Sequence, residues 1–226
     1  LRTTADSADQ RHQLYVQWLN GHAQDPDVLQ LDVVWTPEFA AAGWLLPFDR
    51  FNPQTNDFFP AAIPANRWNS TLFGLPWFID VGMLYWRTDL LARAPRSFEE
   101  LTAAARRAVE RGDVRHGLVW QAARYEGLIT LFVEVLGGFG GRILDDEGEV
   151  TVDAEPAVRA LTWMRDAIHA EGIVPSATLT WQEEQTRFAF QNGTSAMMRN
   201  WPYAFALLQA ADSPVAGKFG VSPVRL

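Results

Sequence analysis

Residues 72–91 read LFGLPWFIDVGMLYWRTDLL, and this segment indicates how the chain is organised. Its apolar runs lie on either side of Pro76 and predict two strand pieces, because proline has no amide hydrogen to donate within a sheet. Asp80 stands among apolar residues, where a charge requires a partner or a ligand. If the regions that flank residues 84–91 form separate sheets, the chain crosses between two lobes here and returns near Lys218.

Strand-like and helix-like segments alternate on both sides of this segment. Residues 28–35 (VLQLDVVW) alternate in character and predict a strand that carries Asp32 near its end. Further strands are expected at 116–121, 194–200 and 219–224. Helices are expected at residues 7–20, 97–112, 125–137, 153–172 and 180–191, and after Pro202. Strands separated by helices predict an α/β fold, and the crossover helices favour parallel pairing.

The helix boundaries follow from capping residues. Ser97 with Glu100, and Thr180 with Glu183, have the spacing of a capping box, so each pair predicts the start of a helix. The helix that begins near Tyr125 is almost entirely apolar, and we expect it to be buried.

The composition favours a globular protein that does not bind polyanions. The 226 residues are 48% apolar and carry a net charge of −8, which repels nucleic acid and anionic lipid. The chain has no cysteine, and its four histidines lack the spacing of a metal site, so we expect no metal and no cofactor. No apolar run is long enough to span a membrane.

Aromatic residues are unusually abundant, with ten tryptophans and 14 phenylalanines, and such a surplus often lines a ligand cleft. Trp201 and Tyr203 flank Pro202, whose fixed φ holds the two rings in a rigid relation. The C–H face of a pyranose packs on such rings with a gain of about 1 kcal/mol per ring. The alternative is that both rings belong to the core.

Two aspartates and two other charged residues are candidate ligands for sugar hydroxyls. Asp32 and Asp80 at strand ends can accept charge-assisted hydrogen bonds, although loop capping explains each equally well. Arg11 opposes the dipole of the first helix, so it needs a partner such as Asp32 or a ligand hydroxyl, unless it simply faces solvent. Glu126 opens the apolar helix and can reach a cleft, or it can serve the helix dipole alone.

Three parts of the chain together resemble a known family. They are residues 25–51 (DPDVLQLDVVWTPEFAAAGWLLPFDRF), residues 72–91, and the segments MMRNWPYAFALL at 197–208 and DSPVAGKFGVSPV at 212–224. The chain resembles the family-1 extracellular solute-binding proteins of bacterial ABC sugar importers, with most similarity to the trehalose- and maltose-binding members.

The resemblance implies an α/β fold with two lobes, the type II periplasmic-binding-protein-like fold, in which the first lobe is incomplete. Residues 1–84 would form the first lobe, 85–88 the hinge crossing, 89–216 the second lobe, and 217–226 the return crossing into the first lobe. The family's first strand and roughly its final third are expected to lie outside this sequence.

The resemblance also implies a function. The lobes of such proteins close on a sugar, which implies a receptor for a glucose-containing disaccharide with Asp32, Asp80, Arg11, Trp201 and Tyr203 in the site. Its partners would be the permease subunits of the importer, and the receptor would be a monomer outside the cytoplasm, in the periplasm or lipid-anchored on the cell surface.

Two positions depart from the family pattern. Phe78 stands where relatives commonly have a tyrosine, and Asp6 stands where a threonine often precedes the first helix. Both changes affect which sugar fits. Two other functions remain open at this point. The pair Asp32 and Asp80 also suits a glycoside hydrolase, and the aromatic surplus also suits a module that binds other proteins.

Overall fold

The computed structural model describes residue 4 and residues 7–224, which divide into two compact units. The first unit ends at Ile79 and the second begins at Asp80. The expected lobe boundaries at residues 84, 88 and 216 refer to the complete two-lobed protein and stay predictions. Asp6 lies outside the described residues.

The second unit is built on a four-stranded sheet with the strand order β4-β5-β3-β6. Its strands are β3 (Met83–Arg87), β4 (His116–Val119), β5 (Ser195–Asn200) and β6 (Phe219–Pro223). β4 and β5 are parallel, whereas β3 is antiparallel to both of its neighbours. The expectation of parallel pairing is therefore correct for one pair of this sheet only, because β3 runs in the direction opposite to that of β5 and β6.

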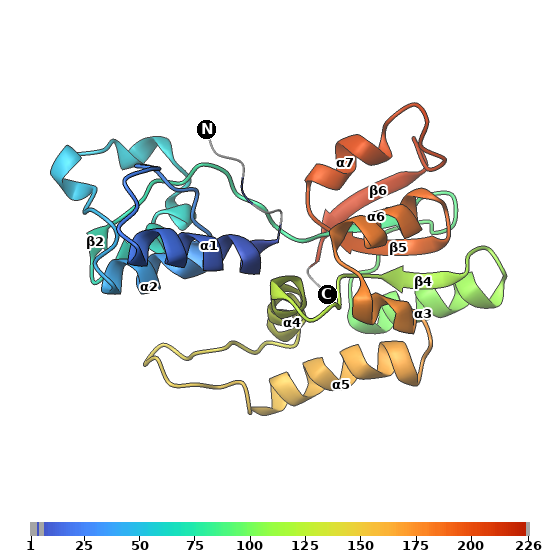
Figure 1. The fold of residues 1–226 in the computed structure, drawn as a ribbon. Coiled ribbons are helices and arrows are strands. Elements are labelled where there is room, and N and C mark those ends of the chain that lie inside the picture. The colour runs from blue at the N-terminus through green and yellow to red at the C-terminus, as the bar shows by residue number, and fades with distance from the viewer. Residues whose placement is uncertain (1–3, 5–6, 225–226) are drawn as a thin grey trace. The chain divides into compact units, whose positions relative to one another are not determined.

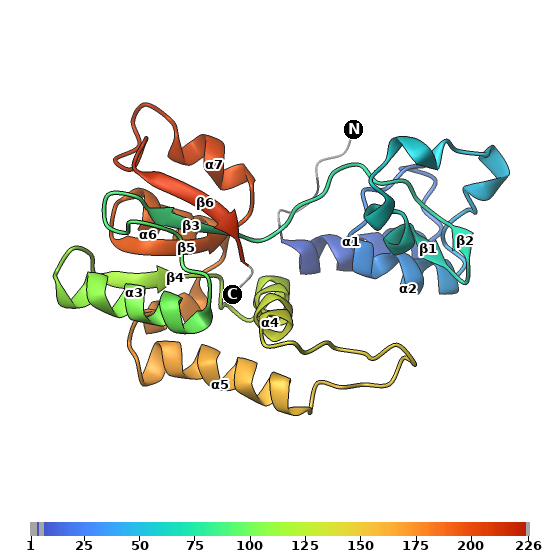
Figure 2. The same ribbon diagram turned by 180° about the vertical axis from the view of Figure 1, so that it is seen from behind.

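Helices cover both faces of this sheet (Figure 1 and Figure 2). Successive strand residues point to opposite faces: Leu84 and Met197 join one core, and Tyr85 and Met198 join the other. The first core includes residues of α3 (Phe98–Glu110), α4 (Glu126–Gly138) and α5 (Glu155–His169). The second core includes residues of α6 (Glu183–Gln191) and α7 (Tyr203–Leu208). The unit thus has the three layers of an α/β fold.

The helix starts agree only in part with the predicted caps. Ser97 caps α3, since its hydroxyl accepts a hydrogen bond from the Glu100 amide at 3.2 Å. The predicted start at Thr180 is wrong, because its hydroxyl donates to the Ala177 carbonyl at 2.9 Å within the 3-10 helix η6 (Ser176–Thr180). Gln182 caps α6 instead.

The apolar helix α4 is buried on one stripe only. Leu131, Val135 and Leu136 join the core, but Ile129 is 59% exposed and Val133 is 44% exposed. The expectation of a buried helix therefore holds for one stripe only, since the described chain covers just one side of α4, in part with α5.

The first unit has short elements and a small aromatic core. Its helices are α1 (Ala8–Asn20) and α2 (Thr36–Ala41), and its strands β1 (Arg67–Trp68) and β2 (Thr71–Leu72) form an antiparallel pair. The buried core of this unit consists of Tyr15, Trp35 and Phe39. The 3-10 helices are η1 (Val33–Trp35), η2 (Asp49–Phe51), η3 (Thr55–Asp57), η4 (Pro60–Ala62) and η5 (Pro64–Asn66).

Two predicted strands are absent or shifted. The predicted strand at 28–35 does not form: residues 28–32 are irregular, and η1 follows them with Asp32 as its N-cap. An isolated extended segment has no neighbour to satisfy its backbone groups, and the sheet of this unit contains β1 and β2 alone. Around Pro76 only β2 precedes the proline, and residues 73–82 are irregular up to β3.

No helix in the described part of the chain has the length and the apolar character needed to cross a membrane.

Candidate functional site

The site in the second unit lies at one edge of the sheet. The carboxyl ends of the parallel strands β4 and β5 meet at this edge, and the amino end of the antiparallel β3 joins them, because Met83 pairs with Asn200. Gln121, which follows β4, donates a hydrogen bond to the Arg199 carbonyl at 3.2 Å. The segment that begins with Trp201 therefore starts beside the ends of two other strands.

Arg199 carries a buried charge beneath this edge. Its side chain is 2% exposed, and its Nε donates to Oε2 of Glu134 at 2.8 Å. Its Nη2 donates to Oε1 of Glu134, and its Nη1 donates to Oε1 of Gln121 at 3.0 Å. These bonds compensate the guanidinium and connect β5 to α4, as a buried charge requires.

Trp201 rests on that guanidinium. The Arg199 Cζ atom lies 3.8 Å from the centroid of the indole ring, which is a close cation–π contact. The Trp201 amide donates to Oδ1 of Asn200 at 2.8 Å, and its carbonyl accepts from the Tyr85 hydroxyl at 2.8 Å. The side chain is half-buried. The alternative that Trp201 is a core residue does not hold, because the residue is only half-buried and polar partners hold both its backbone and its ring.

Glu183 joins two aromatic side chains. Its Oε1 accepts a hydrogen bond from the Tyr125 hydroxyl at 2.7 Å and another from Nε1 of Trp201 at 3.3 Å. Burial, followed by the bond to Glu183, raises the pKa of Tyr125. Glu126 is half-buried at the first position of α4, next to Tyr125 in sequence.

Tyr203 is held in a similar way but is more exposed. Its hydroxyl donates to Oε1 of Glu184 at 2.7 Å, and 41% of the residue is exposed. Burial raises the pKa of the Tyr203 phenol, and the Glu184 carboxylate raises it further. The hydrogen bond from Arg187 lowers the pKa of Glu184 in turn. Pro202 has φ −58° and caps α7, which fixes the backbone between the two rings.

The segment before β3 passes close to the buried ion pair. A Cβ atom added to Gly82 would lie 2.1 Å from Oε1 of Glu134 and 2.7 Å from Nη2 of Arg199. Glycine is therefore required at position 82 for this close approach of the backbone to the ion pair. Asp80 was expected at the carboxyl end of a strand. This expectation is wrong, because Asp80 is exposed and precedes β3.

In the first unit, Arg11 and Asp32 have local partners. The guanidinium carbon of Arg11 lies 5.5 Å from the centroid of the Trp35 ring. The Nε atom of Arg11 is buried and has no hydrogen-bond partner within the described chain. Asp32 accepts a hydrogen bond from the Val34 amide at 3.3 Å, which is the loop-capping alternative considered for it.

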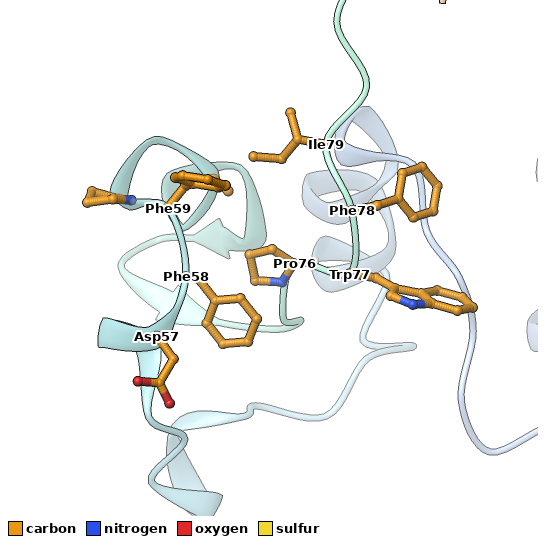
Figure 3. A pocket seen from close by; sticks show the side chains of 9 residues that line it. Asp57, Phe58, Phe59, Pro76, Trp77, Phe78 and Ile79 are labelled. Atoms are coloured by element: carbon orange, nitrogen blue, oxygen red, sulfur yellow. The ribbon is translucent and has the colours of Figure 1, made fainter. Parts of the chain in front are cut away.

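Phe78 belongs to an aromatic pocket of the first unit (Figure 3). The pocket has a volume of about 440 Å³ and lies between the segment that carries Phe58 and Phe59 and the segment that runs from Pro76 to Ile79. Phe78 is 59% exposed and packs edge-on against Trp77, with ring centroids 6.0 Å apart. Asp57 also lines the pocket.

The sequence alone did not indicate Arg199, Gln121, Glu134 or Glu183 as members of one group. The sequence analysis named Glu183 only as part of a predicted capping box. Nothing in the sequence connects Glu183 with Tyr125, which is 58 residues away. In the described chain, no cluster of three or more His, Cys, Asp or Glu residues has the arrangement of a metal site.

Residues 7–225 match the family model described as "Bacterial extracellular solute-binding protein". The chain belongs to the bacterial extracellular solute-binding proteins. The expected α/β fold of the type II binding proteins is confirmed by solved structures of high similarity, over part of their length.

Several relatives of this solute-binding protein are known. A "Probable ABC transporter-binding protein" of Deinococcus radiodurans is 37% identical over 228 residues, which cover 95% of this chain and 53% of the relative. The maltose-bound MalE3 of T. maritima is 42% identical with a TM-score of 0.89, and the match covers 96% of this chain and 57% of that one. The GacH receptor of Streptomyces glaucescens, solved unliganded and with acarbose, is 28% identical with a TM-score of 0.82, covering 95% and 56%.

This solute-binding protein therefore spans little more than half the length of these relatives. The relative of Deinococcus radiodurans is described as a binding protein, and that of Streptomyces glaucescens as a receptor. The matching family consists of extracellular proteins.

Proposed function

We propose that this chain is the sugar-binding part of a receptor for an ABC importer, and that the receptor binds without catalysing a reaction. The ligand is a glucose-containing disaccharide of the trehalose or maltose kind. The receptor acts as a monomer outside the cytoplasm and delivers its sugar to the permease subunits of the importer.

The arrangement around Trp201 is the observation that carries this proposal. Its ring is half-buried, the Arg199 guanidinium supports one face, and its N–H donates to Glu183. A fixed aromatic face suits the C–H face of a pyranose, which gains from apolar contact. Tyr203 follows on the other side of Pro202; its hydroxyl is already hydrogen-bonded, and the residue is 41% exposed.

The relatives support the same ligand class. MalE3 of T. maritima was solved with maltose, and the GacH receptor with acarbose. Both are similar to this chain over nearly its whole length.

The remaining candidate residues are proposed as further sugar ligands, each to be tested by its own substitution. They are Arg11, Asp32, Phe78, Asp80, Glu126 and Asp6. Carboxylates and guanidinium groups form charge-assisted hydrogen bonds to hydroxyls, and Phe78 supplies an exposed ring.

Calorimetry with trehalose and with maltose tests this function. We expect saturable 1:1 binding of at least one sugar, and no glucose after a long incubation of the protein with that sugar. Release of glucose without saturable retention of the sugar would contradict the receptor and favour a glycoside hydrolase. Absence of binding to either sugar would also count against the proposal.

Replacing Trp201 by alanine is expected to weaken sugar affinity by more than about tenfold, because the variant loses the aromatic platform. Circular dichroism should show an unchanged fold. The control is Leu161→Ala, which removes an exposed apolar side chain from α5. An unchanged titration curve for Trp201→Ala would exclude this residue from the site.

A further inference from the structure

Glu183 lies where three elements of the second unit meet. It is the first residue of α6, Tyr125 immediately precedes α4, and Trp201 follows β5. A single oxygen, Oε1, accepts both the Tyr125 hydroxyl at 2.7 Å and the Trp201 indole N–H at 3.3 Å. We propose that Glu183 is a positioning residue that fixes the Trp201 ring for sugar binding. This inference rests on the proposed function.

The face contact with Arg199 does not by itself fix the indole. The guanidinium lies 3.8 Å from the ring centroid, and attraction between a cation and a π face changes slowly when the ring slides sideways. A hydrogen bond is directional and weakens steeply as its angle departs from linearity. The bond from Nε1 to Glu183 therefore restricts the movement that the face contact permits.

Glu183 is itself held in place. The Tyr125 hydroxyl donates the shorter of the two hydrogen bonds, and hydrogen bonds to an ionised acceptor are stronger than neutral ones. The Glu183 carbonyl also accepts from Nδ2 of Asn200 at 3.2 Å, and Asn200 is the residue before Trp201. The first turn of α6 and the end of β5 are thus connected through both backbone and side chain.

The neighbouring carboxylate has a different role. Glu184 forms an ion pair with Arg187 on its own helix and accepts the Tyr203 hydroxyl. Glu183 has no ion pair within the described residues. Its carboxylate accepts hydrogen bonds from two aromatic side chains, Tyr125 and Trp201. This difference assigns the positioning of Trp201 to Glu183 and not to Glu184.

Two substitutions at Glu183 separate positioning from charge. Glu183→Gln retains an oxygen acceptor for both aromatic donors, so we expect its sugar affinity to stay within about threefold of the unmodified protein. Glu183→Ala removes the acceptor, and we expect affinity to fall about tenfold. Glu155→Ala is the matched control, because Glu155 is the first residue of α5 as Glu183 is of α6. We expect no change in affinity for this control.

A sugar-independent measurement completes the test. The indole N–H signal of Trp201 in a ¹H–¹⁵N NMR spectrum is assigned by its loss in Trp201→Phe. We expect this signal to move strongly in Glu183→Ala, to move less in Glu183→Gln, and to stay in place in Glu155→Ala. If Glu183→Ala does not fold, Glu183→Asp replaces it, since aspartate keeps the charge at the helix start but retracts the carboxylate by one methylene.

The possible outcomes separate the two proposals. Failure of the unmodified protein to bind either sugar overturns the proposed function, and with it the positioning role. Normal sugar binding with an unmoved indole signal in Glu183→Ala overturns the positioning role alone. A moved signal with unchanged affinity also overturns it, and so does an equal loss of affinity in Glu183→Gln and Glu183→Ala.

Discussion

At the scale of single residues, Arg199 shows how one buried charge organises a surface site. Its guanidinium donates hydrogen bonds to Glu134 and Gln121, and one face of the guanidinium contacts the Trp201 ring. A buried charge without partners is costly, so the surroundings of Arg199 are strongly constrained. The Trp201 ring is constrained as a result, because it lies against the guanidinium.

Asp32 allows charge to be separated from capping at a single position. Asp32 accepts a hydrogen bond from the Val34 amide at 3.3 Å, and asparagine caps such a turn as well as aspartate does. We therefore expect Asp32→Asn to leave the midpoint of thermal unfolding nearly unchanged while it weakens sugar affinity.

The control for Asp32→Asn is Gln30→Ala in the same irregular segment. Calorimetry should show a larger loss for Asp32→Asn than for Gln30→Ala. Equal losses at the two positions would mean that the segment, and not the carboxylate, had been probed.

Tyr85 makes the stability of the protein depend on pH at high pH. Burial raises the pKa of its phenol from 10.0 to about 12, and its hydroxyl donates to the Trp201 carbonyl. Because the folded-state pKa is the higher one, the stabilisation is complete below pH 10 and is lost as the pH rises toward 12. We expect the free energy of unfolding to fall by about 1–3 kcal/mol over this range.

Urea denaturation at a series of pH values measures this decline. Tyr85→Phe should reduce the decline without abolishing it, because Tyr125 and Tyr203 also have raised pKa values. A pH dependence identical to that of the unmodified protein would exclude Tyr85 as a contributor.

At the scale of elements, two glycines give opposite expectations. A Cβ at Gly82 would meet Glu134 and Arg199 at 2.1 Å and 2.7 Å, whereas a Cβ at Gly137 near the end of α4 meets nothing within 4 Å. Gly82→Ala should therefore destabilise the protein by about 1–3 kcal/mol through overpacking. Gly137→Ala should stabilise it by about 0.5–1 kcal/mol, because alanine favours the helix.

Denaturant midpoints of the two glycine variants check this pair of expectations, and each variant serves as the control for the other. A neutral effect of Gly82→Ala would show that the segment before β3 moves away without cost. In that case the close approach to the ion pair would not be needed for the fold.

At the scale of the whole molecule, the two units differ in the length and the burial of their strands. Every residue of the central strand β5 is buried, while β1 and β2 in the first unit have two residues each. Local opening costs less where fewer apolar side chains are buried. We expect amide protons of β5 to exchange with deuterium more slowly than those of residues 67–72.

Hydrogen exchange followed by mass spectrometry on the intact chain tests this difference between the units. Peptides that contain β4 are the internal reference, since β4 pairs with β5 in the same sheet. Equal protection of β5 and residues 67–72 would contradict the expected order.

Segments with local signals in the sequence formed where they were predicted, whereas features that depend on distant partners did not. Strands and helices with local signals, such as the segments at 116–119, 195–200 and 98–110, lie close to where they were expected. The strand expected at 28–35 did not form, because the alternation of residues specifies a face but does not supply a partner strand. α4 likewise has apolar residues all round but only one covered stripe.

The sequence by itself determined the family and the α/β class, because these depend on motifs and on periodicity along the chain. The same motifs led to the prediction that Trp201 and Tyr203 bind the sugar, which stays a prediction. Only the tertiary structure decided what holds the Trp201 ring. The ring contacts Arg199 of β5 and Glu183 of α6, and Glu183 in turn accepts a hydrogen bond from Tyr125, which is 58 positions away in the sequence. Separations of this kind leave no regular spacing in a sequence. Contacts of that kind exist only once strands and helices have packed into one unit, since packing and not sequence separation sets the distances between their side chains.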